Sequence, residues 1–215
     1  MNTPLKLIGL SKKYNSKEAV RDISFEVNKN EIIGILGPNG CGKTTTIGMI
    51  LGLLKPTKGK VVINGTDIEN QRVNILDQLN FISPYIELPK KLSVKQNLEV
   101  YGRLYDVQNL DTKIEYLSEK LRLGKIINKI TGELSSGQKN RVSLAKSIIN
   151  DPTILLLDEP TASLDPETGD FVRSFLEDYQ KEKETSILLA SHNMAEVERL
   201  CSSVLMMNNG SIIDR

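Results

Sequence analysis

The sequence predicts an α/β fold built on a largely parallel β-sheet. Short apolar segments alternate along the chain with segments of helical periodicity, the order typical of this class. Residues 154–157 and 186–190 have the length and apolarity of central parallel strands that are buried on both faces. The 215 residues suffice to bury a substantial core in one large domain or two small ones.

The first third of the chain predicts a small antiparallel sheet and the start of the core. Residues 5–10, 23–27 and 61–63 are short strand candidates with turn residues between them, which favours a small antiparallel sheet laid on a core. Residues 31–36 form a buried-strand candidate that leads into a glycine-rich loop, and residues 43–51 then have helical character.

The middle of the chain, from Ser93 to Asn150, is helical in pattern. Ser93 with Gln96, and Ser135 with Gln138, have the capping-box spacing that opens a helix. Apolar residues then follow at or near helical spacing, among them Val94, Leu98 and Tyr101, then Ile114, Leu117 and Leu121, and finally Val142, Ala145 and Ile149.

The composition narrows the class of protein. Lys and Arg number 28 against 27 Asp and Glu, a balance that argues against a general nucleic-acid binder, so no nucleic-acid partner is expected. Two cysteines make no disulfide framework and favour a cytosolic protein. No secretory signal is visible at the N-terminus, and the apolar runs fall far short of the ~20 residues of a membrane helix. Any membrane-spanning part is therefore expected from another chain.

The glycine-rich loop has the position and pattern of a phosphate-binding loop. Its glycines let the backbone curl and direct N–H groups at phosphate oxygens, and the following helix adds its positive N-terminal end. Lys43 would reach the outer phosphates of a nucleotide, and the hydroxyl of Thr44 would bind Mg²⁺. The predicted nucleotide-binding residues are Gly37, Pro38, Asn39, Gly40, Cys41, Gly42, Lys43, Thr44 and Thr45.

Two acidic residues, Asp158 and Glu159, follow the apolar run 154–157. Their carboxylates should emerge at the edge where open α/β sheets bind ligands. Asp158 would hold Mg²⁺ through water, and Glu159 would orient and polarise the water that attacks the nucleotide. The alternative interpretation is a pair of surface acids before the turn at Pro160.

The phosphate loop, the segment 134–138 and the two acids occur in the order found in ATP-binding-cassette (ABC) ATPases, and the chain resembles that family over nearly its whole length. The resemblance implies a P-loop NTPase core with a mostly parallel sheet, a small antiparallel β-subdomain and a helical subdomain that carries the family's signature. It implies one nucleotide-binding domain, with the core and β-subdomain at about 1–83 and 151–215 and the helical subdomain at about 84–150.

The resemblance makes Ser135, Ser136, Gly137 and Gln138 the signature segment, although the pattern alone is typical of an ordinary helix N-cap. In the family, two subunits pair head to tail, and the signature of one closes over the ATP held by the phosphate loop of the other. The expected partner is a second copy of the chain or a paralogous ABC subunit. Ser136 stands where the family consensus has glycine, which adds a Cβ close to the phosphate.

The resemblance also gives a role to the only histidine, His192. It matches the family's switch histidine near the γ-phosphate, so the catalytic candidates are Glu159, His192 and Lys43. Asn193 and Glu196 are expected to cap the helix that follows.

Two further residues have both a family role and an ordinary structural one. Asp165 matches the loop that links the two ATP sites of the dimer, and it also has the position of an N-cap ahead of Pro166. Tyr14 matches the aromatic residue that stacks on adenine, although a loop tyrosine often serves only packing.

The match breaks after the strand candidate 79–82. The family carries a glutamine there that contacts Mg²⁺ and couples the site to the membrane partner, but this chain has Pro84. Proline has neither a side-chain amide nor an N–H. Either Ser83 or a water fills the Mg²⁺ position, or the protein couples differently.

The resemblance therefore predicts an Mg²⁺-dependent ATPase that dimerises on ATP and drives a separate transmembrane permease, in the direction of export, from the cytoplasmic face of the cell membrane. The segment 85–91 would face the permease. Two alternatives stay open: a soluble ABC ATPase in macromolecular assembly or repair, and a slow ATP-binding regulatory module. Glu159 and His192 argue against the module, whereas Pro84 argues for it.

Overall fold

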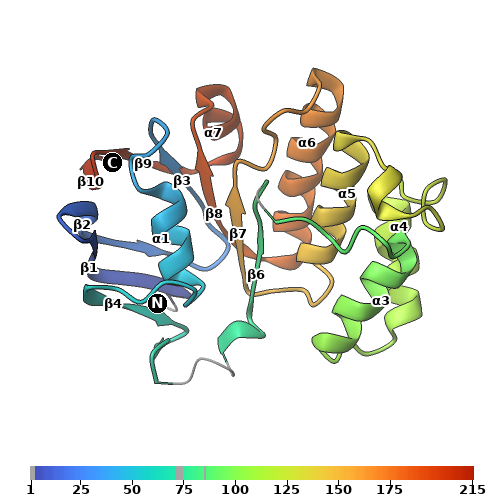
Figure 1. The fold of residues 1–215 in the computed structure, drawn as a ribbon, viewed down its shortest axis with the longest axis horizontal. Coiled ribbons are helices and arrows are strands. Elements are labelled where there is room, and N and C mark those ends of the chain that lie inside the picture. Colours follow the sequence, from blue (N-terminus) through green and yellow to red (C-terminus); the bar gives the residue numbers. More distant parts are fainter. Residues whose placement is uncertain (1–2, 71–74, 85) are drawn as a thin grey trace.

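The computed structural model describes residues 3–70, 75–84 and 86–215, whose strands form two sheets (Figure 1). The strands are β1 (Leu5–Tyr14), β2 (Lys17–Val27), β3 (Ile32–Leu36), β4 (Lys58–Ile63), β5 (Thr66–Asp67), β6 (Leu79–Ile82), β7 (Ile154–Asp158), β8 (Ser186–Ser191), β9 (Ser203–Asn208) and β10 (Ser211–Asp214). The helices are α1 (Lys43–Ile50), α3 (Val94–Leu104), α4 (Leu110–Lys120), α5 (Ser136–Ser147), α6 (Pro166–Lys183) and α7 (Met194–Leu200), with a 3₁₀ turn at Thr131–Glu133.

The larger sheet is almost entirely parallel. Its order is β10-β9-β3-β8-β7-β6, and only the edge strand β10 runs antiparallel to its neighbour. All residues of the predicted run 154–157, which lies in β7, are buried. All six residues of β8 are buried as well. The predicted α/β fold with a mostly parallel sheet is confirmed.

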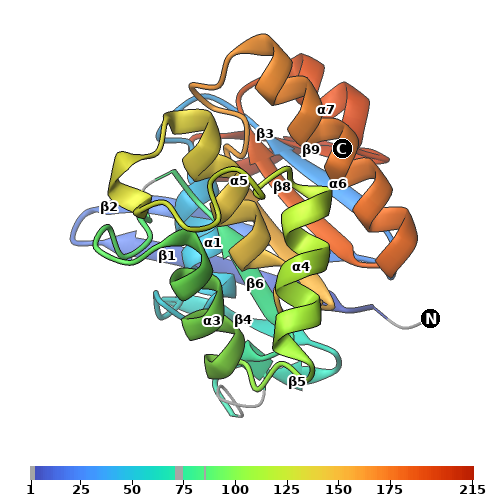
Figure 2. The same cartoon turned by 90° about the vertical axis from the view of Figure 1, so that its right-hand side faces the viewer.

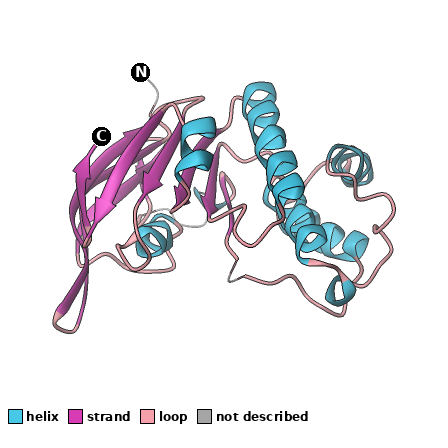
Figure 3. Cartoon of the chain, turned by 90° about the horizontal axis from the view of Figure 1, so that it is seen from above, coloured by secondary structure: helices cyan, strands magenta, loops and turns pink. Residues whose placement is uncertain are grey.

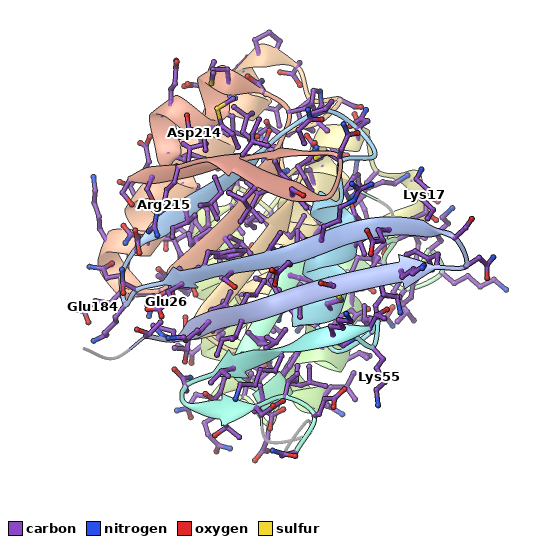
Figure 4. The ribbon with its side chains drawn as sticks, turned by 90° about the vertical axis from the view of Figure 1, so that its left-hand side faces the viewer. Lys17, Glu26, Lys55, Glu184, Asp214 and Arg215 are labelled. Carbon is purple, nitrogen blue, oxygen red and sulfur yellow. The ribbon has the colours of Figure 1, made fainter. Side chains whose placement is uncertain are left out.

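The smaller sheet has the order β2-β1-β4-β5 and is antiparallel throughout, as predicted. Its first two strands extend beyond the predicted apolar stretches, because the hairpin continues as paired but largely exposed backbone from Ser11 to Val20. Figure 4 shows Lys17 at the tip of this hairpin and Glu26 near its other end, where Glu26 pairs with Lys6.

Two apolar cores lie on opposite faces of the larger sheet. One core fills the space between the two sheets and includes Ile47, Met49 and Ile50 of α1. The other core joins the opposite face of the larger sheet to α3, α4, α5, α6 and α7. Figures 2 and 3 show these helices gathered on the side of the larger sheet away from the small sheet.

The two predicted capping boxes are both present. Ser93 and Gln96 exchange hydrogen bonds of 2.8 and 3.1 Å at the start of α3. Ser135 and Gln138 do the same at the start of α5, with distances of 3.1 and 3.3 Å. These reciprocal bonds satisfy amides that a helix start leaves without intrahelical partners, which explains why both helices begin there.

A lysine near the end of α5 connects that helix to the sheet and to α3. The ammonium of Lys146 donates to Oδ1 of Asn80 on β6 at 2.9 Å, and Asn80 is 1% exposed. The same ammonium lies 5.0 Å from the ring centroid of Phe81 and 5.2 Å from that of Tyr101 on α3. Burial lowers the pKa of Lys146 to about 8. The two aromatic rings and the amide oxygen of Asn80 stabilise the ammonium when it is charged.

We expect Lys146→Met to change how stability depends on pH. Burial favours the neutral form of Lys146 in the folded state. Between the folded pKa of about 8 and the ordinary lysine value of 10.5, the folded protein therefore binds fewer protons than the unfolded chain. Stability contributed by this residue is therefore fully present above the unfolded pKa and is lost as the pH falls through the folded value. The stability of wild type relative to Lys146→Met should rise by ~1–3 kcal/mol between pH ~7 and ~10.

Urea unfolding of wild type and Lys146→Met across that pH range measures the difference in their free energies of unfolding. The contributions of titrating groups that both proteins share cancel in this difference. Lys125→Met removes an exposed lysine and serves as the control, whose difference from wild type should stay flat. A flat difference for Lys146→Met as well would contradict the assigned burial of its charge.

Candidate functional site

The predicted site residues converge where the parallel strands end. Leu36 of β3 pairs with Ser191 of β8, and Asp158 of β7 pairs with Ala190 of β8. The phosphate loop follows β3, Glu159 follows β7, and His192 follows β8. The register alone therefore brings three segments that are far apart in the sequence to one edge of the sheet.

The phosphate loop is fitted so closely to its surroundings that side chains are excluded at two of its glycines. A Cβ on Gly37 would lie 2.2 Å from the carbonyl oxygen of Met207, which no real Cβ tolerates. Gly42 has φ 116°, and a Cβ there would lie 2.6 Å from the carbonyl oxygen of Ala19. Both contacts are with backbone atoms, so the loop needs glycine at these positions to keep its curvature.

Lys43, the first residue of α1, turns its ammonium back into the loop. The Nζ atom donates to the carbonyl oxygens of Gly37 at 2.6 Å and Pro38 at 3.3 Å. It also lies 3.8 Å from Oε1 of Glu159, and the lysine side chain is 5% exposed. The cation is therefore positioned at the centre of the loop, where it touches both the loop carbonyls and the catalytic candidate.

Cys41 contributes to the loop through its backbone. Its side chain is 3% exposed and belongs to the core between the two sheets, and its N–H donates to the carbonyl of Pro38 at 3.2 Å. A thiol placed in that core does not point at the cleft. The predicted role of Cys41 in nucleotide binding thus rests on its main chain alone.

Asp158 is a buried carboxylate with one hydrogen-bonded and one unpartnered oxygen. Its Oδ2 accepts from Thr44 Oγ1 at 3.0 Å and from Ser83 Oγ at 3.5 Å. Its Oδ1 has no hydrogen-bond partner among the described residues, and the residue is 1% exposed. Burial raises the pKa of Asp158, whereas the Thr44 hydroxyl acts in the opposite direction.

A buried oxygen without a partner next to two hydroxyls suits a hard cation such as Mg²⁺. The described residues contain no group of three His, Cys, Asp or Glu that could hold a metal. Mg²⁺ commonly takes one or two carboxylates from a protein and its other ligands from a nucleotide and water, so a single carboxylate beside two hydroxyls fits it.

Glu159 lies between the two other catalytic candidates. Its Oε2 is 2.8 Å from Nδ1 of His192, and its Oε1 faces Lys43. Its backbone has φ 51°, which is uncommon for a residue with a side chain, and its N–H donates to the carbonyl of Ala190 at 2.9 Å. The sheet thus holds Glu159 in a strained conformation of the kind found at functional sites.

An open cleft of about 530 Å³ adjoins these groups. Lys43, Thr44 and Thr45 lie at its base with both acids, and Asn39 and Gly40 lie along the loop. Tyr14 stands at the end of β1 among the lining residues, with 45% of its surface exposed. Because the tyrosine ring is accessible, it is available to stack on a ligand, and Lys12 lies 5.1 Å from its ring centroid.

The segment 135–138 lies elsewhere. None of its four residues is among the described residues that line the large cleft, and Ser135 and Ser136 are exposed. Ser136 instead lines a second cavity of about 210 Å³, to which Pro84 and Glu159 also contribute. The chain therefore does not bring its own signature candidate to its own phosphate loop.

Asp165 has the structural role that the sequence predicted for it. It is the N-cap of α6, and its carboxylate accepts from the N–H of Thr168 at 2.9 Å, which lowers the pKa of Asp165. Its link between two sites stays a prediction. Tyr85, the first residue of the predicted permease-facing segment 85–91, lies outside the described residues.

The expected role of Glu196 as a cap is wrong. Asn193 does cap α7, but the carboxylate of Glu196 does not return to the helix start. It accepts from Ser191 Oγ at 2.7 Å and from Thr161 Oγ1 at 2.6 Å, with 2% of the residue exposed. It thereby ties the loop after Glu159 to the end of β8.

A second contact missed by the sequence reading holds that same loop to α5. The side-chain amide of Asn140 donates to the carbonyl of Pro160 at 2.7 Å. No local pattern could have identified the Asn140–Pro160 and Glu196–Thr161 contacts, because they join residues that are 20 and 35 positions apart.

Comparison with known proteins identifies the family. Residues 20–162 match the family described as ABC transporter. The chain belongs to this family. It is 36% identical to the ABC transporter ATP-binding protein NatA of Bacillus subtilis (strain 168), over 97% of this chain and 87% of that protein. It is 38% identical to the Nod factor export ATP-binding protein I of Rhizobium johnstonii, over 95% of this chain but 66% of that protein.

Solved structures agree with this assignment. A structure of an ATP-binding subunit of an ABC transporter superposes with a TM-score of 0.91 at 28% identity, covering 99% of this chain and 89% of that one. A dimeric bacterial ABC transporter cassette superposes with a TM-score of 0.89, at 23% identity and with 98% and 97% of the two chains covered, which supports the fold alone. Among the described residues, no helix is both long and apolar enough to cross a membrane.

We expect Glu196→Ala to destabilise the ABC cassette by roughly 2–4 kcal/mol, because it leaves the buried hydroxyl of Ser191 and the half-buried hydroxyl of Thr161 without their acceptor. Chemical denaturation measures this loss. Glu198→Ala on the exposed side of the same helix is the matched control and should change stability by no more than about 0.5 kcal/mol. Equal effects of the two changes would show that the Glu196 contacts contribute little.

Proposed function

We propose that the chain is the ATP-hydrolysing subunit of an ABC transporter, which dimerises around two ATP molecules and drives a separate membrane permease in the direction of export. The observation that carries the proposal is the convergence of Lys43, Asp158, Glu159 and His192 at one end of the parallel sheet, beside a cleft lined by the phosphate loop. The family supports ATP binding and hydrolysis by such a cassette.

Nucleotide binding would use groups that are already in position. Adenine would stack on the exposed ring of Tyr14, and the phosphates would lie along the loop and the start of α1. The ammonium of Lys43 would exchange its bonds with two neutral carbonyls for bonds with anionic phosphate oxygens. Because that exchange replaces dipoles with full charges, it favours the bound nucleotide.

Mg²⁺ would be held by Thr44 and the buried carboxylate of Asp158, and when bound it would neutralise charge on the outer phosphates. Glu159 would accept a hydrogen bond from the attacking water and polarise it. His192 would orient the Glu159 carboxylate through its Nδ1 atom, 2.8 Å from Oε2. The opposite, exposed face of the imidazole would be left for the γ-phosphate.

Dimerisation would complete each site. The first amides of α5 have no intrahelical acceptors, and the exposed residues Ser135 and Ser136 stand away from the cleft of their own chain. A head-to-tail pairing would bring this helix start to the phosphates held by the partner, and Asp165 would lie at the contact between the sites. The partner would be a second copy or a paralogous subunit.

Residues 1–83 and 151–215 would form the core and β-subdomain, and residues 84–150 would form the helical subdomain. The helical part would contact the permease at the cytoplasmic face of the membrane, through the segment 85–91 and the exposed apolar side chains of α3, Val100 and Leu104. Nod factor export, the activity named for one set of relatives, supports the outward direction.

We expect Glu159→Gln to lower ATP turnover by ~10²–10⁴, the usual contribution of a positioned acid/base group, while ATP affinity is retained. Turnover is measured by phosphate release with Mg²⁺, and affinity by titration with a fluorescent ATP analogue. Glu167→Gln, an exposed substitution in the first turn of α6, is the control. Near-normal turnover of Glu159→Gln would refute the role of that residue.

We also expect Glu159→Gln to accumulate as an ATP-bound dimer, because the paired state forms but does not reset by hydrolysis. Size-exclusion chromatography with light scattering measures the dimer fraction. Adding Ser135→Arg should abolish the dimer and leave ATP binding to the monomer intact, since an arginine side chain blocks the approach of the second subunit. A Glu159→Gln protein that stays monomeric at saturating ATP would oppose the shared-site proposal.

A further inference from the structure

We propose that the hydroxyl of Ser83 is an oxygen ligand of Mg²⁺ in this protein, alongside Thr44, in place of the glutamine that Pro84 removes. The inference rests on the proposed ATPase function and assigns a metal-positioning role to a residue outside the phosphate loop and the paired acids.

The strand register brings Ser83 to the site. β6 pairs in parallel with β7, with Ile82 opposite Leu157. Ser83 follows the last residue of β6, and Asp158 is the last residue of β7, so the two lie side by side where the strands end. Pro84 disfavours a helical backbone at the residue before it and keeps the chain extended at this point. The hydroxyl therefore arrives at the same edge as the carboxylate through backbone geometry alone.

The distances fit a cation site that needs little rearrangement. Ligand oxygens at adjacent corners of an Mg²⁺ octahedron lie ~3 Å apart, since each lies about 2.0–2.1 Å from the ion. Thr44 Oγ1 is 3.0 Å from Asp158 Oδ2, and Ser83 Oγ is 3.5 Å from the same oxygen. A serine side chain closes the remaining half ångström by a small rotation about its Cα–Cβ bond.

The carboxylate of Asp158, which lies between these hydroxyls, independently supports a cation at this place. Asp158 is 1% exposed and its Oδ1 has no hydrogen-bond partner among the described residues. A buried, half-satisfied carboxylate is costly, and a divalent cation or its bound water removes that cost. Thr44 and Ser83 flank the carboxylate from two different elements, α1 and the end of β6, so an ion there would be held between them.

Pro84 explains why a serine would supply the metal ligand at this position. Proline has neither a side-chain amide nor an N–H, so the side chain at position 84 offers no ligand to the metal. Pro84 lines the cavity of about 210 Å³ that also contains Ser83 and Glu159. A hydroxyl one residue earlier is shorter than a glutamine side chain, but it starts closer to Asp158.

The test measures metal binding without turnover. In the Glu159→Gln background with ATP bound, Mn²⁺ replaces Mg²⁺ and its affinity is read by electron paramagnetic resonance. We expect Ser83→Ala to weaken Mn²⁺ binding about three- to tenfold while ATP affinity in EDTA is unchanged. Ser143→Ala removes another serine that lines the same cavity and should leave Mn²⁺ affinity unchanged. Unchanged Mn²⁺ affinity in Ser83→Ala would overturn the proposal in favour of water at that position.

A change of ligand softness separates ligation from a structural role. Ser83→Cys supplies a thiolate, which favours soft cations, so it should weaken Mn²⁺ binding and strengthen Cd²⁺ binding relative to wild type. Loss of Mn²⁺ affinity without a gain for Cd²⁺ would contradict direct ligation. Failure of the Glu159→Gln parent to bind ATP with any metal would instead refute the proposed function.

Pro84→Gln provides the complementary measurement. Restoring the amide should strengthen Mn²⁺ binding in the Ser83→Ala background, because the longer side chain then reaches the vacated coordination position. No recovery in the double variant, with ATP affinity in EDTA intact, would contradict the claim that the two positions serve the same ion.

Discussion

The parallel pairing of β3, β8, β7 and β6 is the constraint on which the rest of this structure depends. Each strand delivers one polar segment to the same edge, and the spacing between neighbouring strands sets how far apart those segments lie. The phosphate loop, the paired acids, the histidine and Ser83 come from four separate regions of the sequence. Their mutual distances follow from hydrogen bonding between backbones, because the polar side chains themselves are too few to define the geometry.

A second level of structure holds the loops at that edge. Glu196 joins the loop after Glu159 to the end of β8, and Asn140 joins the same loop to α5. Lys146 and Asn80 connect the other end of α5 to β6, the strand that leads to Ser83. The helix that begins with the signature candidate is thus hydrogen-bonded both to the loop after Glu159 and to the strand that leads to Ser83.

Much of the fold and of the site could be predicted because local signals were sufficient. The two capping boxes located α3 and α5, and the apolar runs located β3, β7 and β8. The loop glycines are required by contacts with Met207 and Ala19, but their spacing alone was already diagnostic. β5 was missed because it has only two residues, and the β9–β10 pair was missed because its apolar residues are partly exposed. Glu196 was misassigned because its carboxylate bonds to side chains outside the helix start, those of Ser191 and the distant Thr161. Lys146 was overlooked because only the packing of α5 against β6 and α3 buries it.

The hydrogen bonds from Lys43 to the loop carbonyls have a consequence for the end of the reaction cycle. A cation left alone in a buried site would bind the departing phosphates tightly and slow their release. Here the carbonyls of Gly37 and Pro38 receive the ammonium as soon as it is free. These carbonyls would compete with phosphate oxygens for the ammonium, so in the proposed ATPase the departure of product would be an exchange between two sets of oxygen acceptors.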